Sequence, residues 1–359
     1  MSSIIGQNLK ISLFGESHGN AIGVVIDGLN SGIRIDFEMI KEELNKRRSL
    51  DNISTSRNEL DELNILSGYF NDHTTGTPLC VTIENLDIKS KDYEGNLIRP
   101  SHADYAAQLK YHGFQDYRGG GHFSGRITAA LVVAGSICKQ ILKNKNINIV
   151  SHIKSIKNIE DDDFVILNDE VVSRLNKNYF PVNNSEVKEK MIALIAKAKA
   201  EGDSVGGVVE TFVLGIEGGI GEPFFDSIEA VLSKLIFSIP GIKGLEFGKG
   251  FELTKFLGSE ANDQFYYEKE IKTKTNNNGG VNGGITNGMP ITLRVAVKPT
   301  PSISKTQKTI NLNTMKEEDL NIKGRHDPCI VHRALVVIES MIAIGLVDLH
   351  FSRYGYQWG

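Results

Sequence analysis

Apolar residues recur along the chain with two spacings, one typical of strands and one typical of buried helices. Alternation of apolar with other residues predicts strands over residues 21–29, 77–85, 205–216 and 290–299. In the last segment the alternation places Lys298 on the polar face of the strand, just before a proline. Such strands form sheets with one face in the core and the other more polar.

Four segments have helical signals. Residues 36–48 begin at a capping aspartate and end in three cations, and residues 185–202 begin at a capping serine and end in glycine. Residues 126–142 and 333–349 are apolar nearly all round, which predicts burial between layers. Long buried helices and one-face-apolar strands predict an α+β fold, a β-α-β sandwich with the long helices buried between two antiparallel sheets.

Composition narrows the class of protein. The chain has 359 residues, of which 40% are hydrophobic and 23% are charged, so it can bury a large core, and we expect one domain over residues 1–359. A net charge of −4 argues against a nucleic-acid partner. The longest apolar run, residues 334–347, is interrupted by Glu339 and too short to span a bilayer, which argues against a membrane.

Cysteine usage and the N-terminus favour a cytoplasmic location. Cys80, Cys138 and Cys329 have no CxxC spacing, which fits a reducing compartment better than a disulfide framework. Residues 1–10 lack a basic segment followed by an apolar stretch, so no signal peptide is expected. The nine histidines and three cysteines have no zinc-motif spacing, and we expect no metal site.

Arginine is scarce, and its placement suggests anion binding. Of 40 basic residues only 12 are arginine, and five of these lie in three short, unusual segments: Arg47, Arg48, Arg118, Arg126 and Arg325. Arginine binds carboxylate and phosphate through two parallel hydrogen bonds, whereas lysine acts as a point charge. Clustered arginines therefore suggest an anionic ligand, although any one of them could be an ordinary surface residue.

The segment "YRGGGHFSGR" (residues 117–126) is the strongest candidate for an anion site. Three consecutive glycines permit positive φ, so several backbone N–H groups can point at one spot ahead of a helix N-terminus. Arg118 and Arg126 bracket this nest. It lacks the GK[ST] ending of a P-loop, and a flexible glycine loop is the competing interpretation.

The segment "FGESHG" (residues 14–19) contains G-x-S-x-G, the nucleophile elbow of α/β-hydrolases, with Ser17 as nucleophile. The context argues against a hydrolase, because a predicted strand rather than a helix follows and too few residues precede it. His18 is a candidate acid or base, since a turn would present its imidazole. The alternative is a tight glycine turn with no chemistry.

Three further segments carry candidate chemistry. In "RPSHADY" (99–105), Ser101 would cap a helix with His102 in its first turn, or the histidine packs on its own turn. In "KGRHDPC" (323–329), Asp327 is either a base or a helix N-cap, with Pro328 at the first helical position. "NNNGGVNGGITNG" (276–288) permits close approach to a flat ligand, or is a surface loop, and Lys298, Thr300 and Ser302 could hold a phosphate.

Taken together, these segments resemble the chorismate synthase family. "FGESHGNAIGVVIDGLNSGI", "RPSHADY", "DYRGGGHFSGR", "EGDSVGG", "GEPFFD", "NGGVNGGITNGMPI", "KPTPSI" and "KGRHDPC" follow in the family's order, from about residue 6 to 350. The resemblance implies a lyase of the shikimate pathway that eliminates phosphate from 5-enolpyruvylshikimate 3-phosphate to give chorismate. It further implies reduced FMN as cofactor with no net redox change, NADPH as a source of reducing equivalents, and a homotetramer.

The resemblance also implies roles for particular residues. His18 would protonate the departing phosphate, His102 would hold the reduced flavin in its reactive protonation state, and Asp327, assisted by Ser17, would take part in proton removal at the flavin N5. Arg47, Arg48, Arg118 and Arg126 match family arginines around the substrate or NADPH. The positions that match FMN contacts are His122, Phe123, Ser124, Gly241, Gly283, Lys298, Pro299, Thr300, Pro301, Ser302 and Arg325.

The chain departs from the family pattern at a few positions. The family usually has arginine where His122 stands, a glutamate where Ile127 stands, and a further arginine within residues 49–54.

Two other classes of protein remain open from the residues alone. A flavin-dependent oxidoreductase would share the cofactor loops but transfer electrons on each turnover, and a non-catalytic anion-binding protein would tolerate loss of His18 and His102. We expect dependence on an external flavin reductant.

Overall fold

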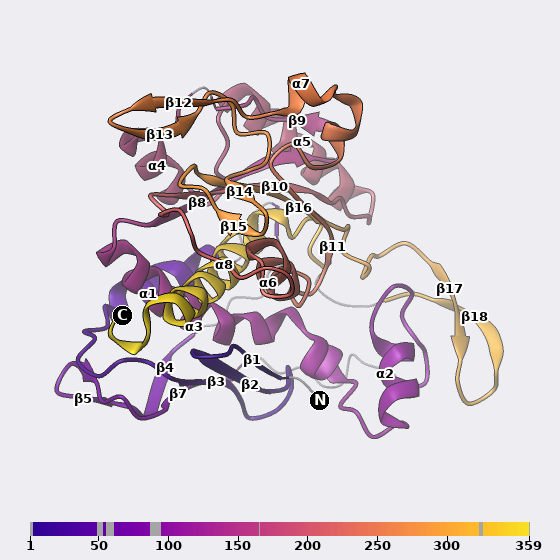
Figure 1. Cartoon of the computed structure of the whole chain (residues 1–359). Helices are drawn as coiled ribbons and strands as arrows, with labels where there is room; N and C mark the ends of the chain where they lie inside the picture. The colour runs from indigo at the N-terminus through magenta and orange to yellow at the C-terminus, as the bar shows by residue number, and fades with distance from the viewer. Residues whose placement is uncertain are drawn as a thin grey trace.

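The computed structural model describes residues 3–48, 53–54, 61–86, 95–164, 166–322 and 326–358. Two five-stranded antiparallel sheets enclose a layer of helices (Figure 1). The first sheet has the order β1 (Ile4–Ile5), β2 (Lys10–Gly15), β3 (Ala21–Asp27), β7 (Leu79–Glu84), β4 (Leu63–Ser67). The second has the order β11 (Ile242–Phe247), β16 (Ile291–Val297), β10 (Gly207–Leu214), β8 (Asn148–Ile156), β9 (Ile159–Glu160). The predicted α+β sandwich is confirmed.

The helix layer is built on α3 (Thr128–Asn144) and α8 (Val331–Tyr354), with α1 (Phe37–Lys46) and α6 (Ile228–Ile236) beside them. The two long helices approach closely, because a Cβ on Gly135 of α3 would clash with the backbone and side chain of Ser340 on α8. Both are buried along most of their length, as their apolar sequences predict.

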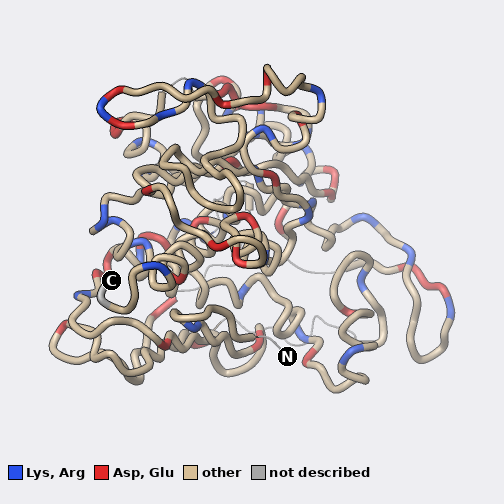
Figure 2. The backbone as a smooth tube through the Cα atoms, viewed as in Figure 1, with Lys and Arg blue, Asp and Glu red and all other residues tan. Residues whose placement is uncertain are grey.

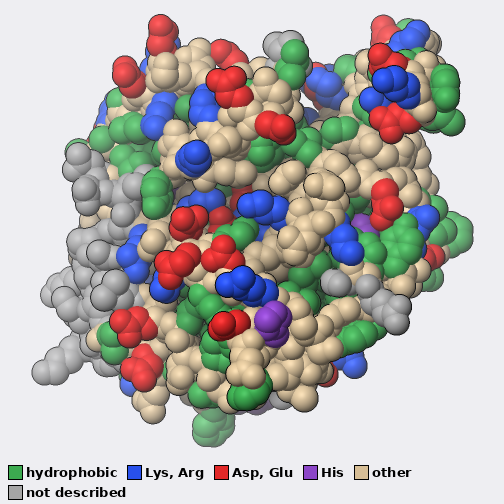
Figure 3. All heavy atoms as spheres, turned by 90° about the vertical axis from the view of Figure 1, so that its left-hand side faces the viewer, with side chains coloured by type: hydrophobic (Ala, Val, Ile, Leu, Met, Phe, Trp, Pro, Cys, Tyr) green, Lys and Arg blue, Asp and Glu red, His purple; other side chains and the backbone are tan. Residues whose placement is uncertain are grey.

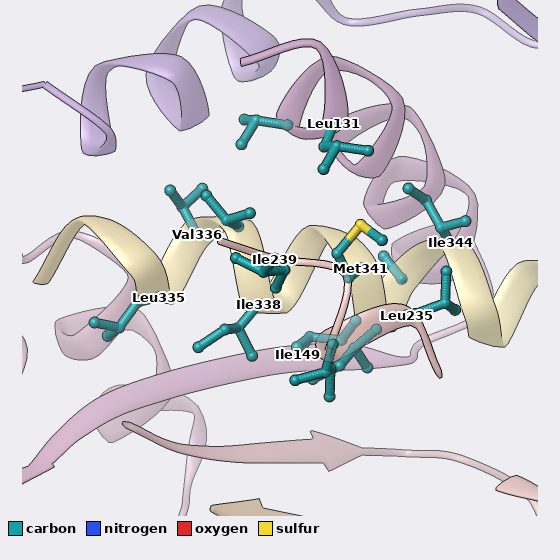
Figure 4. Packing of buried hydrophobic residues seen from close by; sticks show 14 of the residues in the cluster. Leu131, Ile149, Leu235, Ile239, Leu335, Val336, Ile338, Met341 and Ile344 are labelled. Carbon is teal, nitrogen blue, oxygen red and sulfur yellow. The ribbon is translucent and has the colours of Figure 1, made fainter. Parts of the chain in front are cut away.

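The core runs through the helix layer to both sheets. Figure 4 shows Leu131 of α3 facing α8, whose Val336 and Met341 lie between α3 and the second sheet. Ile149 of β8 and Leu235 of α6 close the other side of α8. In β16 the buried and half-buried residues alternate strictly, which confirms the predicted strand.

Shorter elements lie around the sandwich, and two hairpins, residues 265–273 and 307–320, extend away from it (Figure 1). The helical ones are α2 (Asp104–Tyr111), η2 (Arg118–Phe123), η3 (Gly125–Ile127), α4 (Asp169–Asn176), α5 (Ser185–Ala200), η4 (Gly250–Lys255), α7 (Gly258–Ala261) and η5 (Tyr356–Trp358). The strands are β5 (Tyr69–Phe70), β6 (His73–Thr74), β12 (Phe265–Glu268), β13 (Glu270–Thr273), β14 (Val281–Asn282), β15 (Ile285–Thr286), β17 (Gln307–Asn311) and β18 (Lys316–Leu320).

The predicted helix caps are partly right. Asp36 caps α1 by accepting hydrogen bonds from the backbone N–H groups of Glu38 and Met39, as expected. The cap of α5 is Asn184 rather than Ser185, because the amide oxygen of Asn184 accepts from the backbone N–H groups of Glu186 and Val187. Both asparagine and serine serve this role, and they are adjacent here, so the sequence alone did not choose between them.

Length and composition would allow two segments to cross a bilayer, Gly125–Asn144 and Val331–Tyr354, yet 94% and 100% of their most apolar windows are buried inside the protein. Their apolar surface is thus used by the core. Among the described residues no cluster of His, Cys, Asp and Glu could hold a metal ion. Charged residues lie mainly around the periphery (Figure 2), and on the face in Figure 3 the two signs are interspersed.

Candidate active site

A cavity of about 800 Å³ lies where the N-terminal ends of α3 and α8 meet the first sheet. Segments far apart in sequence line it: β1 and β2, the 99–104 turn, the glycine loop, the end of α6, the 298–302 segment and the residues before α8. Of the predicted residues, those lining it are His18, His102, His122, Phe123, Ser124, Gly241, Lys298, Pro299, Thr300, Pro301, Ser302 and Asp327. The three proposed acids and bases thus share one chamber.

The glycine loop has the backbone expected of a nest. Gly119, Gly120 and Gly121 have φ values of 59°, 85° and 52°. A Cβ on Gly119 would clash with the imidazole of His18 and the hydroxyl of Ser17, so only glycine fits against this pair. The backbone N–H of Ser17 donates to the carbonyl of Gly121 at 3.0 Å, which ties the two motifs together.

His18 and Ser17 form a buried pair. His18 is 7% exposed and lines the cavity, whereas Ser17 is fully buried behind it. The hydroxyl of Ser17 lies 3.3 Å from Nδ1 of His18. Ser17 thus contacts His18 in this structure, so its geometry suits orientation of the imidazole better than direct contact with a ligand.

His102 lines the same cavity from the 99–104 turn, and its imidazole is held in the neutral form. Its Nε2 is 2.7 Å from the hydroxyl of Ser302. Burial, with a smaller contribution from Arg99, lowers the pKa of His102 to about 4. The predicted helix cap is wrong: α2 begins at Asp104, and Ser101 has a positive φ of 59°, so His102 precedes the helix instead of occupying its first turn.

The 298–302 segment offers polar groups to a ligand. Lys298 Nζ donates to the carbonyl of Ser101 at 2.8 Å, which joins this segment to the His102 turn. Burial, together with Lys243, lowers the pKa of Lys298. The hydroxyl of Thr300 is buried, lines the cavity and has no hydrogen-bond partner among the residues that the structure describes. A buried hydroxyl without a partner is costly, which points to a ligand that completes it.

Asp327 lines the cavity but does not cap α8. The residue at the cap position is Ile330, and the helix begins at Val331, three residues later than the Pro328 start that the sequence suggested. Instead, Oδ2 of Asp327 accepts a hydrogen bond of 2.6 Å from Nη1 of Arg333, on the first turn of the helix. The carboxylate is therefore directed by a side chain rather than by the helix backbone.

The arginines expected around an anion are paired with acidic residues. Arg47 and Arg126 both contact Asp61, and all three are buried. Arg118 forms a two-point ion pair with Asp116, so it does not point into the nest. Arg47, Arg48, Arg118 and Arg126 do not line the cavity, although Arg47 donates to Gly125 and Thr128, which do. Nε of Arg48 is buried and has no partner.

Of the remaining predicted cofactor positions, one lies away from the cavity and one lies outside the described residues. Gly283 is in the β14–β15 turn and does not line the cavity. Arg325 falls outside the described residues, as do residues 49–52 of the segment that departs from the family pattern. His122, another departure, places Nδ1 2.8 Å from the carbonyl of Gly15 and Nε2 3.3 Å from the hydroxyl of Ser3.

Several lining residues were not anticipated. Arg99 and Asp104 form an ion pair at 2.7 Å in the cavity wall, and their place at the two ends of the "RPSHADY" motif was the available signal. Lys234 from α6 and Met341 from α8 also line it, with an apolar wall from β1 and β2. Nothing local in sequence marks these residues, because only folding brings them to the cavity.

The chamber fits a flavin with an anionic substrate. Its volume of about 800 Å³ is within the range of small-molecule sites. An apolar wall from β1, β2 and Leu131 suits a flat ring, and the unpartnered hydroxyl of Thr300 suits a polar ligand atom. Arg99, Lys234 and Lys298 in the lining favour negative charge.

Comparison with known proteins agrees with this geometry. The family model described as chorismate synthase matches residues 9–351. A chorismate synthase of Pyrococcus abyssi is 47% identical over 352 residues, which are 97% of this chain and 98% of the relative. One of Methanobrevibacter smithii is 46% identical, covering 99% and 98%. A crystal structure of chorismate synthase superposes with a TM-score of 0.77 at 29% identity, covering 98% of this chain and 94% of the other.

Proposed function

The chain belongs to the chorismate synthase family and is a lyase, and we propose that it eliminates phosphate from 5-enolpyruvylshikimate 3-phosphate by an FMN-dependent anti-1,4-elimination. The observation that carries this proposal is the single cavity into which His18, His102 and Asp327 converge from three distant segments. An elimination needs an acid for the leaving group and a base for the departing proton, held in one water-poor chamber.

The residues that would hold FMN are the 298–302 segment, Gly241 and residues 122–124, all of which line the cavity. Reduced FMN, when bound, supplies an electron-rich ring that assists departure of the allylic phosphate without net oxidation. Thr300 would donate its unpartnered hydroxyl to the ligand, and Lys298 would offer an ammonium group. Because Gly283 lies away from the cavity, its expected contact with FMN is not supported by this chain's own geometry.

His18 would donate a proton to the departing phosphate oxygen. Its side chain is almost fully buried and lines the cavity, so the donated proton is shielded from bulk water. Ser17 would keep the ring in place, since its hydroxyl lies 3.3 Å from Nδ1 of His18. Gly119 packs against both side chains and prevents them from shifting.

Asp327 would accept the proton held at N5 of the cofactor, and His102 would stabilise the anionic form of the reduced cofactor. The low pKa of His102, about 4, means that its imidazole is neutral before an anion enters. A nearby negative charge favours the imidazolium, so binding would raise that pKa and take up a proton. His102 is thus able to respond to the charge of what it contacts.

The substrate carries one phosphate and two carboxylates, which require several cations. Arg99, Lys234 and Lys298 line the cavity directly. Arg47, Arg48, Arg118 and Arg126 are proposed to join them, or to bind NADPH. For Arg47, Arg118 and Arg126 this requires release from an acidic partner. For Arg48, the buried Nε has no hydrogen-bond partner among the described residues.

The test is an anaerobic assay of the full chain with 5-enolpyruvylshikimate 3-phosphate, with and without reduced FMN. Stoichiometric release of phosphate and chorismate, strictly dependent on a catalytic amount of reduced FMN, is expected. Flavin oxidised once per turnover would indicate an oxidoreductase instead. Ligand binding without phosphate release would indicate the anion-binding alternative.

The cellular setting is proposed on the same family basis. One continuous core, shared by both sheets and the helix layer, supports a single catalytic domain over residues 1–359. We expect a cytoplasmic homotetramer whose flavin is reduced by NADPH through an external reductase. Sedimentation of the purified protein would test the oligomeric state, and addition of NADPH alone to the assay would test whether the chain reduces its own flavin.

A further inference from the structure

We propose that Arg333 is a positioning residue that holds the carboxylate of Asp327 in its working orientation and couples it to Arg47. This inference rests on the proposed role of Asp327 in proton transfer. Arg333 belongs to the first turn of α8, two residues after the helix begins at Val331. It does not line the cavity, so it would act through the residues that it binds.

The first contact of Arg333 is the ion pair with Asp327. Nη1 of Arg333 donates to Oδ2 of Asp327 at 2.6 Å. Their side chains are 23% and 16% exposed, so water competes only weakly for this pair. A short, charge-assisted hydrogen bond fixes which oxygen of the carboxylate faces the arginine and which faces the cavity.

The second contact reaches the C-terminal end of α1. Nε of Arg333 donates to the backbone carbonyl of Arg47 at 2.6 Å. Arg47 is the C-cap of α1, where carbonyl groups lack helical partners and the helix dipole is negative, so a cation there is favourable. One planar guanidinium therefore binds two acceptors, one on the same chain segment and one that is 286 residues away in the sequence.

The carbonyl of Arg47 is linked to the cavity through its own side chain. Arg47 Nε donates to Thr128 Oγ1 and its Nη2 donates to the carbonyl of Gly125, both at 3.1 Å. Gly125 begins η3, Thr128 begins α3, and both residues line the cavity. Arg333 thus connects Asp327, the proposed base, to Arg47, one of the arginines proposed to bind the substrate.

Geometry explains why arginine is needed. Two acceptors lie in different directions from the side chain, and the rigid fork of a guanidinium can serve both at once. A lysine has one nitrogen on a flexible stem, so it would keep the charge but lose the fixed angle between the two contacts. An uncharged side chain of similar length would leave the half-buried carboxylate of Asp327 with one fewer donor.

The experiment is a double-mutant cycle on the full chain with substrate and reduced FMN. We compare Arg333→Met, Arg333→Lys, Asp327→Asn and the Arg333→Met/Asp327→Asn double variant. We expect Arg333→Met to lower kcat by about 30-fold or more while the dissociation constant for FMN changes less than about threefold, and Arg333→Lys to recover only part of kcat. The double variant should be no slower than Asp327→Asn alone, because both changes act on one group.

Arg294→Met is the matched control. Arg294 pairs with Glu246 on the second sheet, with side chains 23% and 25% exposed, and also lies within 3.4 Å of two backbone carbonyl oxygens. Arg294→Met should lower the free energy of unfolding about as much as Arg333→Met does, while its kcat stays unchanged. Equal kcat losses in Arg294→Met and Arg333→Met, or additive losses in the double variant, would overturn the inference. A wild-type chain without turnover would overturn the proposed function and this inference together, whereas an active wild type with additive losses overturns only the inference.

Discussion

Two groups of ion-paired side chains lie at opposite ends of helix α3, and they differ in how their charges are balanced. In its C-terminal half, Lys139 pairs with Glu43 of α1 and with Glu339 of α8, the latter at 2.5 Å, and Lys46 pairs with Glu43 at 2.5 Å. We call these four residues the helix cluster. At the N-terminal end, Arg47 and Arg126 contact Asp61 beside the cavity. We call these three residues the loop cluster.

The helix cluster is balanced, with two cations and two carboxylates on three rigid helices. Burial opposes ionisation of Glu43, but Lys139 and Lys46 outweigh it and lower the pKa of Glu43 to about 2. Burial likewise opposes the charge on Lys139, which Glu339 and Glu43 overcome, so the pKa of Lys139 is raised. Such a network holds α1, α3 and α8 together, and its charges are balanced without a bound ligand.

The loop cluster has one carboxylate for two guanidinium groups among its three residues, and it adjoins residues that line the cavity. The difference teaches that burial of charge does not by itself mark an active site. What marks it is an arrangement in which a ligand anion could replace a protein carboxylate. Four experiments test this contrast between the helix cluster and the loop cluster.

Replacement of His18 tests whether the chemistry lies at the cavity end of α3. His18→Ala should lower kcat by about 10² to 10⁴-fold, the usual contribution of a general acid, with FMN binding and the melting temperature little changed. Phosphate release under anaerobic conditions measures it. His73→Ala, at an exposed histidine outside the cavity lining, is the control and should leave kcat unchanged. Full turnover by His18→Ala would exclude its role as the acid.

Replacement of Lys139 tests whether the helix cluster is purely structural. Lys139→Met leaves two buried carboxylates without their shared partner, so we expect a loss of about 3–5 kcal/mol in the free energy of unfolding. Denaturant titration measures the loss, and kcat of the folded protein should be unchanged. A triple variant that also replaces Glu43 and Glu339 with leucine should recover most of the stability. A selective fall in kcat would contradict a structural role.

Replacement of Asp61 tests whether the loop cluster accepts an outside anion. Asp61→Asn removes one negative charge but leaves the other acceptors of Arg126, Asn85 Oδ1 and the carbonyl of Glu84, so we expect a loss of about 1–3 kcal/mol. Inorganic phosphate should raise the melting temperature of this variant more than that of the wild type. Lys139→Met, which changes the charge in the opposite direction, should show no extra response. Equal phosphate responses in all three proteins would remove the contrast.

The smallest effect concerns the protonation of His102. Its pKa of about 4 lies below the usual value near 6.5, so between these values the unfolded chain binds more protons than the folded one. This contribution to stability is complete above pH 6.5 and is lost as the pH falls toward 4. NMR titration of the labelled imidazole should give a midpoint near 4 in the free protein and a higher one with phosphate bound. A midpoint near 6.5 in the free protein would contradict burial as the cause.

Much of the fold and many of the site residues followed from local pattern. Strict alternation in β16 and the all-apolar sequences of α3 and α8 predicted elements that the structure confirms. The glycines of residues 119–121 predicted positive φ, which they have. The predicted cap at Ser101 was wrong, because the chain turns through a positive φ there and α2 begins only at Asp104. Of the two roles left open for Asp327, the structure excludes the cap, because its carboxylate pairs with Arg333 instead of the helix backbone.

The sequence alone predicted four strands, four helices, the sandwich class and the family, because hydrophobic periodicity and motifs can be recognised without knowing which segments meet in space. Only the tertiary structure decided which charges meet. Arg47 and Arg126 are bound to Asp61, Arg118 is bound to Asp116, and Arg333 joins Asp327 to the backbone of Arg47. The physical reason is that an arginine accepts any nearby carboxylate or carbonyl, so its partner is set by the distances that folding creates and not by spacing along the chain.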